Sequence, residues 1–292
     1  MSNSASSPES AGQNPVGPTD GTAPRGLAEL RAELDRIDTL VHDLLIERAL
    51  VVEEVGRSGK PAAFRPGREA AIVRRLTGRH TGKLPKQALF RIWRELLAGT
   101  TGMQTPLQIA VCDADPGAGM TQIAREHFGA MTPLRAHRSP SGALTEVCNR
   151  TASVAVLPMP TESDGWWTTL SRQQPRIHVI ARLPFWSIRP EGTPTAQALV
   201  VATSAPDPSG HDRSLLLLEL DADVSRQKLT AELTAAGLPP GTMVLHRAPG
   251  SPIASVLVEV DGYVADDDKR LADVPRQKVV LGGYAVPIGD NA

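Results

Sequence analysis

An arginine interrupts an otherwise apolar helical stripe near the start of the chain. Apolar residues recur at alternating spacings of three and four across residues 27–55, but the position that should continue the stripe in its middle is Arg48. A guanidinium group buried without a partner is strongly unfavourable. Arg48 therefore snorkels to solvent, pairs with a local acid such as Glu47 or Glu53, or faces an interior cavity that holds an anion.

Other polar side chains favour the cavity. Thr100 and Gln104 continue, at a spacing of four, the apolar face that Ile92 and Leu96 form in a later helical segment. Arg31 stands beside the stripe near the start of the first helix, and Arg68 and Glu69 open a short helix. Arginine offers a rigid bidentate fork to carboxylates, so a helical bundle with these groups turned inward would bind a small polyanion.

These side chains need long helices to position them. The apolar spacing predicts a helix over residues 26–57, about 45 Å long at 1.5 Å per residue, followed by helices over about 69–76 and 85–104. One helix of that length cannot bury its stripe alone, so it requires partner helices or a second copy of itself. We expect a three-helix unit over residues 25–105, preceded by a disordered tail over 1–24 that is rich in Ser, Pro and Gly.

Three segments of this unit carry a family resemblance. They read LAELRAELDRIDTLVHDLLIERALVVEEVGR, FRPGREAAIVRRL and LFRIWRELLAGTTGMQ. Over about residues 26–104 the chain resembles the all-α class of chorismate mutase. The matching features are the LxxLRxxLDxID opening, the Glu-Arg pair seventeen residues after Arg31, the Arg-Glu pair that opens the second helix, and the polar pair that ends the third. The resemblance implies an intertwined helical dimer.

The resemblance implies that four side chains bind the substrate, chorismate. Arg48 and Arg31 would bind its two carboxylates, with Arg31 supplied across the interface by the second subunit of the homodimer. Arg68 and Thr100 would line the pocket. No cofactor and no metal are implied.

The implied reaction is the Claisen rearrangement of chorismate to prephenate. Glu69 would take the ring hydroxyl, and Gln104 and a lysine would bond the ether oxygen. Lys60 is the only candidate for that lysine, because the linker after Arg48 is shorter than in many relatives. With Arg48, these residues form the expected catalytic set. The enzyme would hold a flexible dianion in a compact conformer and place donors where negative charge grows on the breaking C–O bond.

Beyond residue 105, short apolar runs alternate with helical windows. Residues 106–205 predict an α/β lobe, with strands near 107–113, 153–160, 177–183 and 198–203 and helices near 119–128 and 164–173. Residues 206–292 predict the order β-α-β-β-α-β of a ferredoxin-like domain. The expected fold class is therefore multi-domain α and α+β.

This second half is similar, more weakly, to prephenate dehydratase with its ACT regulatory domain. The similar segments are DADPGAG, SVAVLPMP and KVVLGGYAV. Where relatives carry Glu-Asn and Thr-Arg-Phe, this chain has Pro160-Thr161 and Ala196-Gln197-Ala198, so we expect dehydratase chemistry to be lost. We interpret the ACT-like domain as a structural or oligomerising module, with an altered effector site as the alternative.

Composition restricts the classes of function. The formal net charge is −1 over 292 residues, which provides no global reason to bind nucleic acid or a membrane. Two cysteines exclude a disulfide scaffold and fit a reducing cytosol. The first residues contain no apolar core region, so we expect no secretory signal there, and no apolar run approaches the ~18 residues of a membrane span. We expect a cytoplasmic protein with no nucleic-acid or membrane partner.

Two other functions stay open on the sequence. Residues 60–94 contain ten Lys and Arg and one acid, so a non-enzymatic basic helical module could bind DNA, RNA or an acidic partner. A bifunctional chorismate mutase/prephenate dehydratase is the other alternative. Inward placement of Arg48, Thr100 and Gln104 would favour the mutase, because a binding module has no reason to interrupt its own seam.

Overall fold

The computed structural model describes residues 25–58, 64–221 and 224–289. Its first elements are the helices α1 (Leu27–Arg57), α2 (Pro66–Gly78) and α3 (Lys86–Gln104), which confirm the three predicted helices. The tail expected over 1–24 lies outside the described residues. The chain divides into two units between Val51 and Val52, so the greater part of α1 is described by itself.

The helix α1 has no buried residue. Its apolar side chains are exposed along the predicted stripe, at Leu27, Leu30, Leu34, Ile37, Val41, Leu44, Val51 and Val55. The spacing of these residues forms a helix, but local spacing cannot supply the surface that covers it. The stripe is therefore a long apolar surface of the kind that marks a protein interface.

The buried face of α3 differs from the expected one. We expected Ile92 on the apolar face, but its side chain is 57% exposed. Phe90, Arg94, Leu97 and Thr101 are buried and follow one another at spacings of four, three and four, and the expected Thr100 is buried beside them. The face is turned in this way because α3 packs against both α2 and α4 (Met120–Phe128). This rotation brings a guanidinium group into the interior.

One nine-stranded sheet runs through the rest of the described chain, in the order β2-β1-β3-β5-β4-β9-β6-β8-β7. Its first five strands are β1 (Ile109–Cys112), β2 (Leu134–His137), β3 (Val154–Pro158), β4 (His178–Leu183) and β5 (Ala198–Ala202). The strands β1, β2 and β3 are parallel, whereas β5 pairs antiparallel with both β3 and β4.

Two elements of this lobe were not predicted. They are the edge strand β2 and the helix α5 (Pro140–Cys148), which begins at a Ser139 cap. The segment expected as a helix near 164–173 is instead the 3₁₀ helix η2 (Trp166–Arg172). A further 3₁₀ turn, η1 (Pro116–Ala118), leads into α4.

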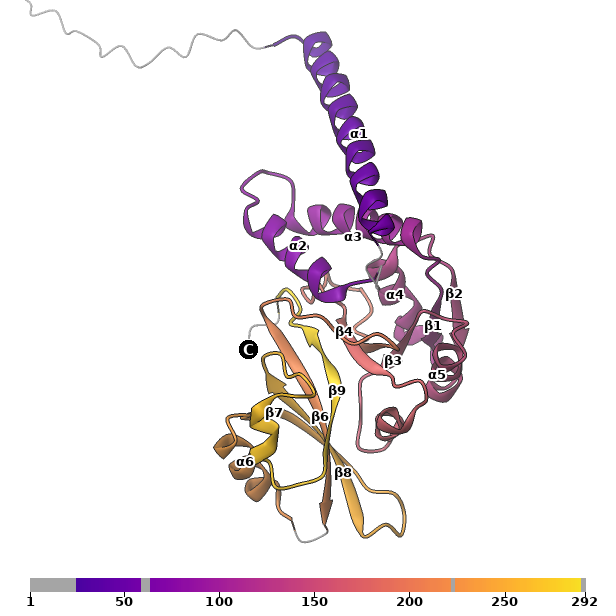
Figure 1. The fold of residues 1–292 in the computed structure, drawn as a ribbon. Coiled ribbons are helices and arrows are strands. Elements are labelled where there is room, and N and C mark those ends of the chain that lie inside the picture. Colours follow the sequence, from indigo (N-terminus) through magenta and orange to yellow (C-terminus); the bar gives the residue numbers. More distant parts are fainter. Residues whose placement is uncertain (1–24, 59–63, 222–223, 290–292) are drawn as a thin grey trace, which may run out of the picture. The chain divides into compact units, whose positions relative to one another are not determined.

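The remaining elements confirm the predicted ferredoxin-like order. They are β6 (Asp212–Asp221), α6 (Arg226–Ala235), β7 (Pro240–His246), β8 (Ile253–Asp261), η3 (Lys269–Asp273) and β9 (Lys278–Ala285). Their order in the sheet is β9-β6-β8-β7, and Figure 1 shows these strands with α6 beside them.

The two halves of the sheet meet at one close approach. Val179 of β4 pairs with Gly282 of β9 in parallel, and a Cβ on Gly282 would lie 2.2 Å from the backbone oxygen of Val179. Gly282 also has a φ of 122°, which a side chain disfavours. A glycine is therefore required for the strands of the two expected regions to share one sheet.

The helix α2 contacts β4 and β9, which are neighbours in the middle of the strand order, and α3 packs against α2. Ala70 and Val73 of α2 and Phe90 of α3 form an apolar cluster with Phe185 and Ala285. This packing positions the first turn of α2, where two of the predicted site residues lie. Within the described ranges, no helix combines the length and apolar character that a membrane crossing needs.

Candidate active site

Two of the predicted arginines lie far apart on one helix. Arg31 is exposed near the start of α1, and Arg48 is half-buried seventeen residues later. At 1.5 Å per residue their backbones are about 25 Å apart. One copy of α1 therefore cannot direct both guanidinium groups at one small molecule. Of the two acids considered as local partners of Arg48, Glu53 pairs with Arg57 at 2.5 Å.

Glu69 lies in a buried polar cluster between α2 and α3. Its Oε2 pairs with Nη1 of Arg94 at 3.0 Å, and its Oε1 accepts a hydrogen bond from the hydroxyl of Thr101 at 3.4 Å. Both partners lie on the inward face of α3. Arg94 is only 3% exposed and also donates from Nε and Nη2 to the backbone oxygen of His127, at 2.9 and 2.5 Å.

Burial changes the proton affinities in this cluster. Desolvation raises the pKa of Glu69, and the cation of Arg94 and the hydroxyl of Thr101 offset only part of that shift. Desolvation lowers the pKa of His127 well below its ordinary value, and the nearby Arg94 lowers it further. Both ring nitrogens of His127 are buried without a hydrogen-bond partner among the described residues. The imidazole therefore stays neutral in the folded chain.

The predicted residues at the end of α3 are turned inward. Gln104 donates from Nε2 to the backbone oxygen of Val52 at 3.0 Å. The hydroxyl of Thr100 is buried and donates to the backbone oxygens of Leu96 and Leu97, at 2.9 and 3.1 Å. Gln104 therefore reaches the last turns of α1, whereas these bonds hold Thr100 to its own helix.

The side chain of Arg68 is exposed. Its backbone N–H is bonded to a loop of the sheet region, which is the part of the chain that follows α3. Asp207, in the loop between β5 and β6, accepts hydrogen bonds from the backbone N–H of Gly67 at 2.9 Å and of Arg68 at 3.1 Å. The same carboxylate pairs with Arg65 at 3.2 Å. Arg65 itself provides no side-chain cap for α2, so Asp207 satisfies N–H groups that the helix leaves free.

Arg74, on the third turn of α2, makes a further link to the sheet region. It donates to the hydroxyl of Ser209 at 2.8 Å and to the backbone oxygen of His211 at 2.9 Å. It also donates to the backbone oxygen of Val286. The helix that carries Arg68 and Glu69 is thus attached to the sheet region at its first and third turns.

The structure brings together some of the predicted residues. Arg68 and Glu69 lie on the first turn of α2, and Thr100 lies one residue from Thr101, which bonds Glu69. Lys60 lies outside the described residues. Arg31 and Arg48 belong to the unit that is described by itself.

Sequence reasoning missed two participants, Arg94 and Asp207. Arg94 follows Phe90 by four residues and precedes Leu97 by three, so the helical period of the buried face could have identified it. Asp207 lies about 140 residues from the helix that it caps, and no local pattern in the sequence indicates that contact.

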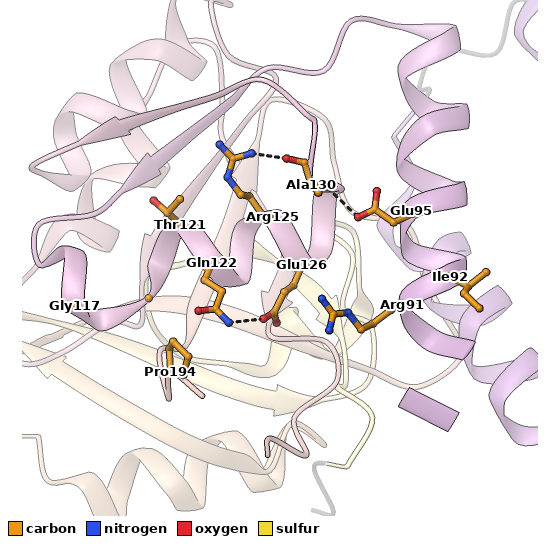
Figure 2. A pocket seen from close by; sticks show the side chains of 11 residues that line it. Arg91, Ile92, Glu95, Gly117, Thr121, Gln122, Arg125, Glu126, Ala130 and Pro194 are labelled. Atoms are coloured by element: carbon orange, nitrogen blue, oxygen red, sulfur yellow. Dashed lines mark hydrogen bonds between the residues drawn. The ribbon is translucent and has the colours of Figure 1, made fainter. Parts of the chain in front are cut away.

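An open cleft lies beside this cluster, between α3 and α4. It has a volume of about 840 Å³ and is lined by Arg91, Glu95, Arg125 and Glu126, among others. Figure 2 shows Arg91 directed at α4 and Ile92 directed away from it. Three of the four charged groups are used within the protein, because Arg125 and Glu95 bond the backbone of Ala130, and Glu126 binds Arg189 and Gln122. None of the predicted site residues lines this cleft.

A smaller, mostly apolar pocket of about 80 Å³ lies on the sheet, with Pro160, Leu215 and Val244 in its wall. Two of its polar groups, Tyr284 and Glu259, are bonded to each other. The phenol of Tyr284 donates to Glu259, which also pairs with Arg213 at 2.8 Å. Desolvation and the adjacent Glu259 raise the pKa of Tyr284, so its hydroxyl remains a donor.

The helices α1, α2 and α3 precede the mixed sheet in the chain, and the polar cluster lies between α2 and α3. Residues 30–105 match the family described as chorismate mutase type II. This part of the chain is a chorismate mutase type II domain, as the resemblance of its three segments implied.

The curated relatives of the chain are longer proteins. A bifunctional chorismate mutase/prephenate dehydratase from Neisseria gonorrhoeae is 31% identical over 136 residues, which cover 46% of this chain and 37% of the relative. A protein of the same description from Pseudomonas aeruginosa is 27% identical over 152 residues, which cover 48% of this chain and 40% of the relative. The matched part of the chain thus spans about 40% of the length of these relatives.

Solved structures are similar over the larger part of the chain. A prephenate dehydratase from Streptococcus mutans covers 62% of this chain and 98% of its own, at a TM-score of 0.45 and 14% identity. A structure described as a novel type of quorum quenching acylase covers 62% of this chain and 95% of its own. Its TM-score is 0.48 and its sequence identity is 15%. At these values the likeness supports no conclusion about activity.

Proposed function

We propose that this chain is a cofactor-free chorismate mutase that converts chorismate to prephenate as a homodimer. The match of residues 30–105 to the chorismate mutase type II family is the observation that carries this proposal. The inward placement of Thr100 and Gln104 at the end of α3 supports it, because a purely surface-binding module has no reason to turn these groups inward.

The occupant we assign to the exposed stripe of α1 is a second copy of this chain. Arg31 and Arg48 are about 25 Å apart along one helix, so a shared ligand needs Arg31 from one copy and Arg48 from the other. The stripe continues along the whole helix, and a second α1 offers a matching length of apolar surface.

Each predicted side chain then has a role in this reaction. Arg48 and the Arg31 of the second copy bind the two carboxylates, while Arg68 and Thr100 line the pocket. Glu69 accepts the ring hydroxyl. Gln104 and Lys60 donate to the ether oxygen, where negative charge grows as the C–O bond breaks.

The rearrangement needs no nucleophile, since bonds break and form within one molecule. The protein's task is to hold the dianion in the compact conformer, and fixed arginine forks can do this without reorganising during the reaction. The donors that face the ether oxygen stabilise the transition state more than the ground state, which accelerates the step.

The test follows the loss of chorismate absorbance with the purified full-length chain. Arg48→Ala is expected to abolish turnover while the fold stays intact by circular dichroism. Arg36→Ala is the matched control, because Arg36 lies on the same helix and pairs only with Glu33 on the surface. A variant without Arg48 that retains near-normal kcat/KM would refute the role of Arg48.

The bifunctional chorismate mutase/prephenate dehydratase is the second candidate, because the curated relatives carry that description. Product analysis in the same assay separates the two. Accumulation of prephenate supports the mutase alone, whereas phenylpyruvate formed faster than prephenate decays by itself supports the bifunctional enzyme.

The non-enzymatic basic module has less support. Of the basic residues in 60–94, Arg65, Arg74 and Arg94 are used in contacts within the chain. We retain the proposal of a cytoplasmic location, which the free thiols of Cys112 and Cys148 support.

A further inference from the structure

We propose that the sheet region completes the mutase site, with Asp207 and Arg94 acting as positioning residues for Arg68 and Glu69. This inference rests on the proposed function. It gives the C-terminal region a role in the mutase reaction, through two contacts that bear on one turn of α2.

The first contact is the cap that Asp207 provides. Its two carboxylate oxygens accept the N–H groups of two consecutive residues, Gly67 and Arg68. A carboxylate at a helix N-terminus also interacts favourably with the helix dipole. The position of Asp207 thus sets where α2 begins and which direction Arg68 takes from the helix, because one residue of slip turns a side chain by about 100°.

The fit at this cap is close. A Cβ on Gly67 would lie 2.0 Å from the backbone oxygen of Asp207, so only glycine allows the loop to approach this far. Arg65, which directly precedes α2, also pairs with Asp207, at 3.2 Å. The first turn of α2 is therefore held against a specific loop of the sheet region.

The second contact is the bridge that Arg94 makes. One edge of its guanidinium group binds Glu69, and the other binds the backbone oxygen of His127 in the last turn of α4. That oxygen is among the carbonyls that a helix leaves without a partner. Because the guanidinium group is planar and rigid, the end of α4 fixes the orientation of the Glu69 carboxylate.

The two contacts act on neighbouring residues of the first turn of α2. Asp207 holds the backbone at residues 67–68, and Arg94 holds the side chain at residue 69. Substrate groups placed even 1 Å wrongly can slow a reaction about 100-fold. The sheet region therefore affects turnover without touching the substrate.

The experiment compares Asp207→Ala and Arg94→Lys with the wild-type full-length chain. Lysine keeps the charge of Arg94 but cannot bind Glu69 and His127 in one plane. We expect kcat to fall about 10- to 100-fold in each variant, with a smaller change in KM. Asp207→Asn retains one oxygen acceptor and should recover part of the lost rate.

Asp268→Ala is the matched control. Asp268 also caps a short helix, by accepting the N–H of Arg270 at 3.0 Å, and also pairs with an arginine. It directly precedes η3, and its side chain bonds Arg270. Its kcat should stay within twofold of the wild type.

A second readout reports the contact itself. Asp207→Ala should accelerate amide hydrogen exchange at Gly67 and Arg68 at least tenfold, whereas Asp268→Ala should not. For Arg94, the acid limb of the kcat/KM profile reports the pKa of Glu69, which Arg94, Asp207 and Thr101 face. Arg94→Gln removes the only cation among them and should move that limb to higher pH.

The outcomes are separable. If the wild type converts chorismate while Asp207→Ala and Arg94→Lys keep kcat within twofold, the positioning role is wrong. If the wild type has no mutase activity, the proposed function fails. Exchange at Gly67 and Arg68 then still decides whether Asp207 holds α2, and unchanged exchange overturns that contact.

Discussion

Arg94 and Glu69 form an ion pair of 3.0 Å in which both side chains are almost fully buried. The pair joins α3 to the first turn of α2, and the same arginine reaches the end of α4. A residue expected to bind substrate is thus bound to the interior of its own chain.

Removing one partner of this ion pair should strongly lower the stability of the protein. Arg94→Met leaves the Glu69 carboxylate buried without its cation, which costs about 3–5 kcal/mol of unfolding free energy. Urea denaturation measures this loss. The double variant Arg94→Met/Glu69→Leu removes both charges and should recover much of the stability. A loss under about 1 kcal/mol for Arg94→Met would contradict a buried pair.

His127 should make stability depend on pH. Its pKa is lowered in the folded chain, so below the ordinary value near 6.5 the unfolded chain binds a proton that the folded chain does not. Stability due to this group is complete above that pH and falls as the pH decreases, by up to about 1.4 kcal/mol per unit. Denaturation of wild type and His127→Gln between pH 8 and 5 should show the steeper loss in the wild type. Equal slopes would mean that His127 titrates normally.

Gly67→Ala should destabilise the start of α2. The new Cβ would lie 2.0 Å from the backbone oxygen of Asp207, so the cap must move apart, at a cost of about 1–3 kcal/mol. Gly78→Ala, at the other end of the same helix, has open space around the new Cβ and serves as the control. A thermal melt compares the two, and an unchanged Gly67→Ala melting temperature would show that the loop does not press on this residue.

The stripe of α1 should drive association. The wild-type chain has a mass of 31.1 kDa, and size-exclusion chromatography with light scattering should measure twice that mass. Val41→Glu places a charge on the stripe and should give the monomer with loss of mutase activity. Met131→Glu, at a residue 91% exposed outside α1, should stay dimeric and active. A wild type that is monomeric at micromolar concentration would contradict the second copy as partner.

Local patterns predicted the elements well where burial follows a simple period. The three N-terminal helices and the runs such as SLLLLEL show that continuous or periodic apolar residues suffice for this. The strand β2 was missed because its four residues lie at an edge and none is fully buried, so it lacks an apolar signature. The face of α3 was misplaced because the packing of α2 and α4 against it, which the spacing does not reveal, selects the buried side.

The sequence by itself determined the helical domain and the residue types of its site, because helix period and the Arg, Glu, Thr and Gln positions are properties of neighbouring residues. Only the tertiary structure decided what holds those residues. The cap from Asp207 and the bridge from Arg94 depend on contacts between segments that are distant in the sequence. Asp207 is separated by 140 residues from Gly67, the residue of α2 that it caps. Spacing in a sequence carries information about one element at a time, whereas these contacts arise from how the sheet and the helices pack together.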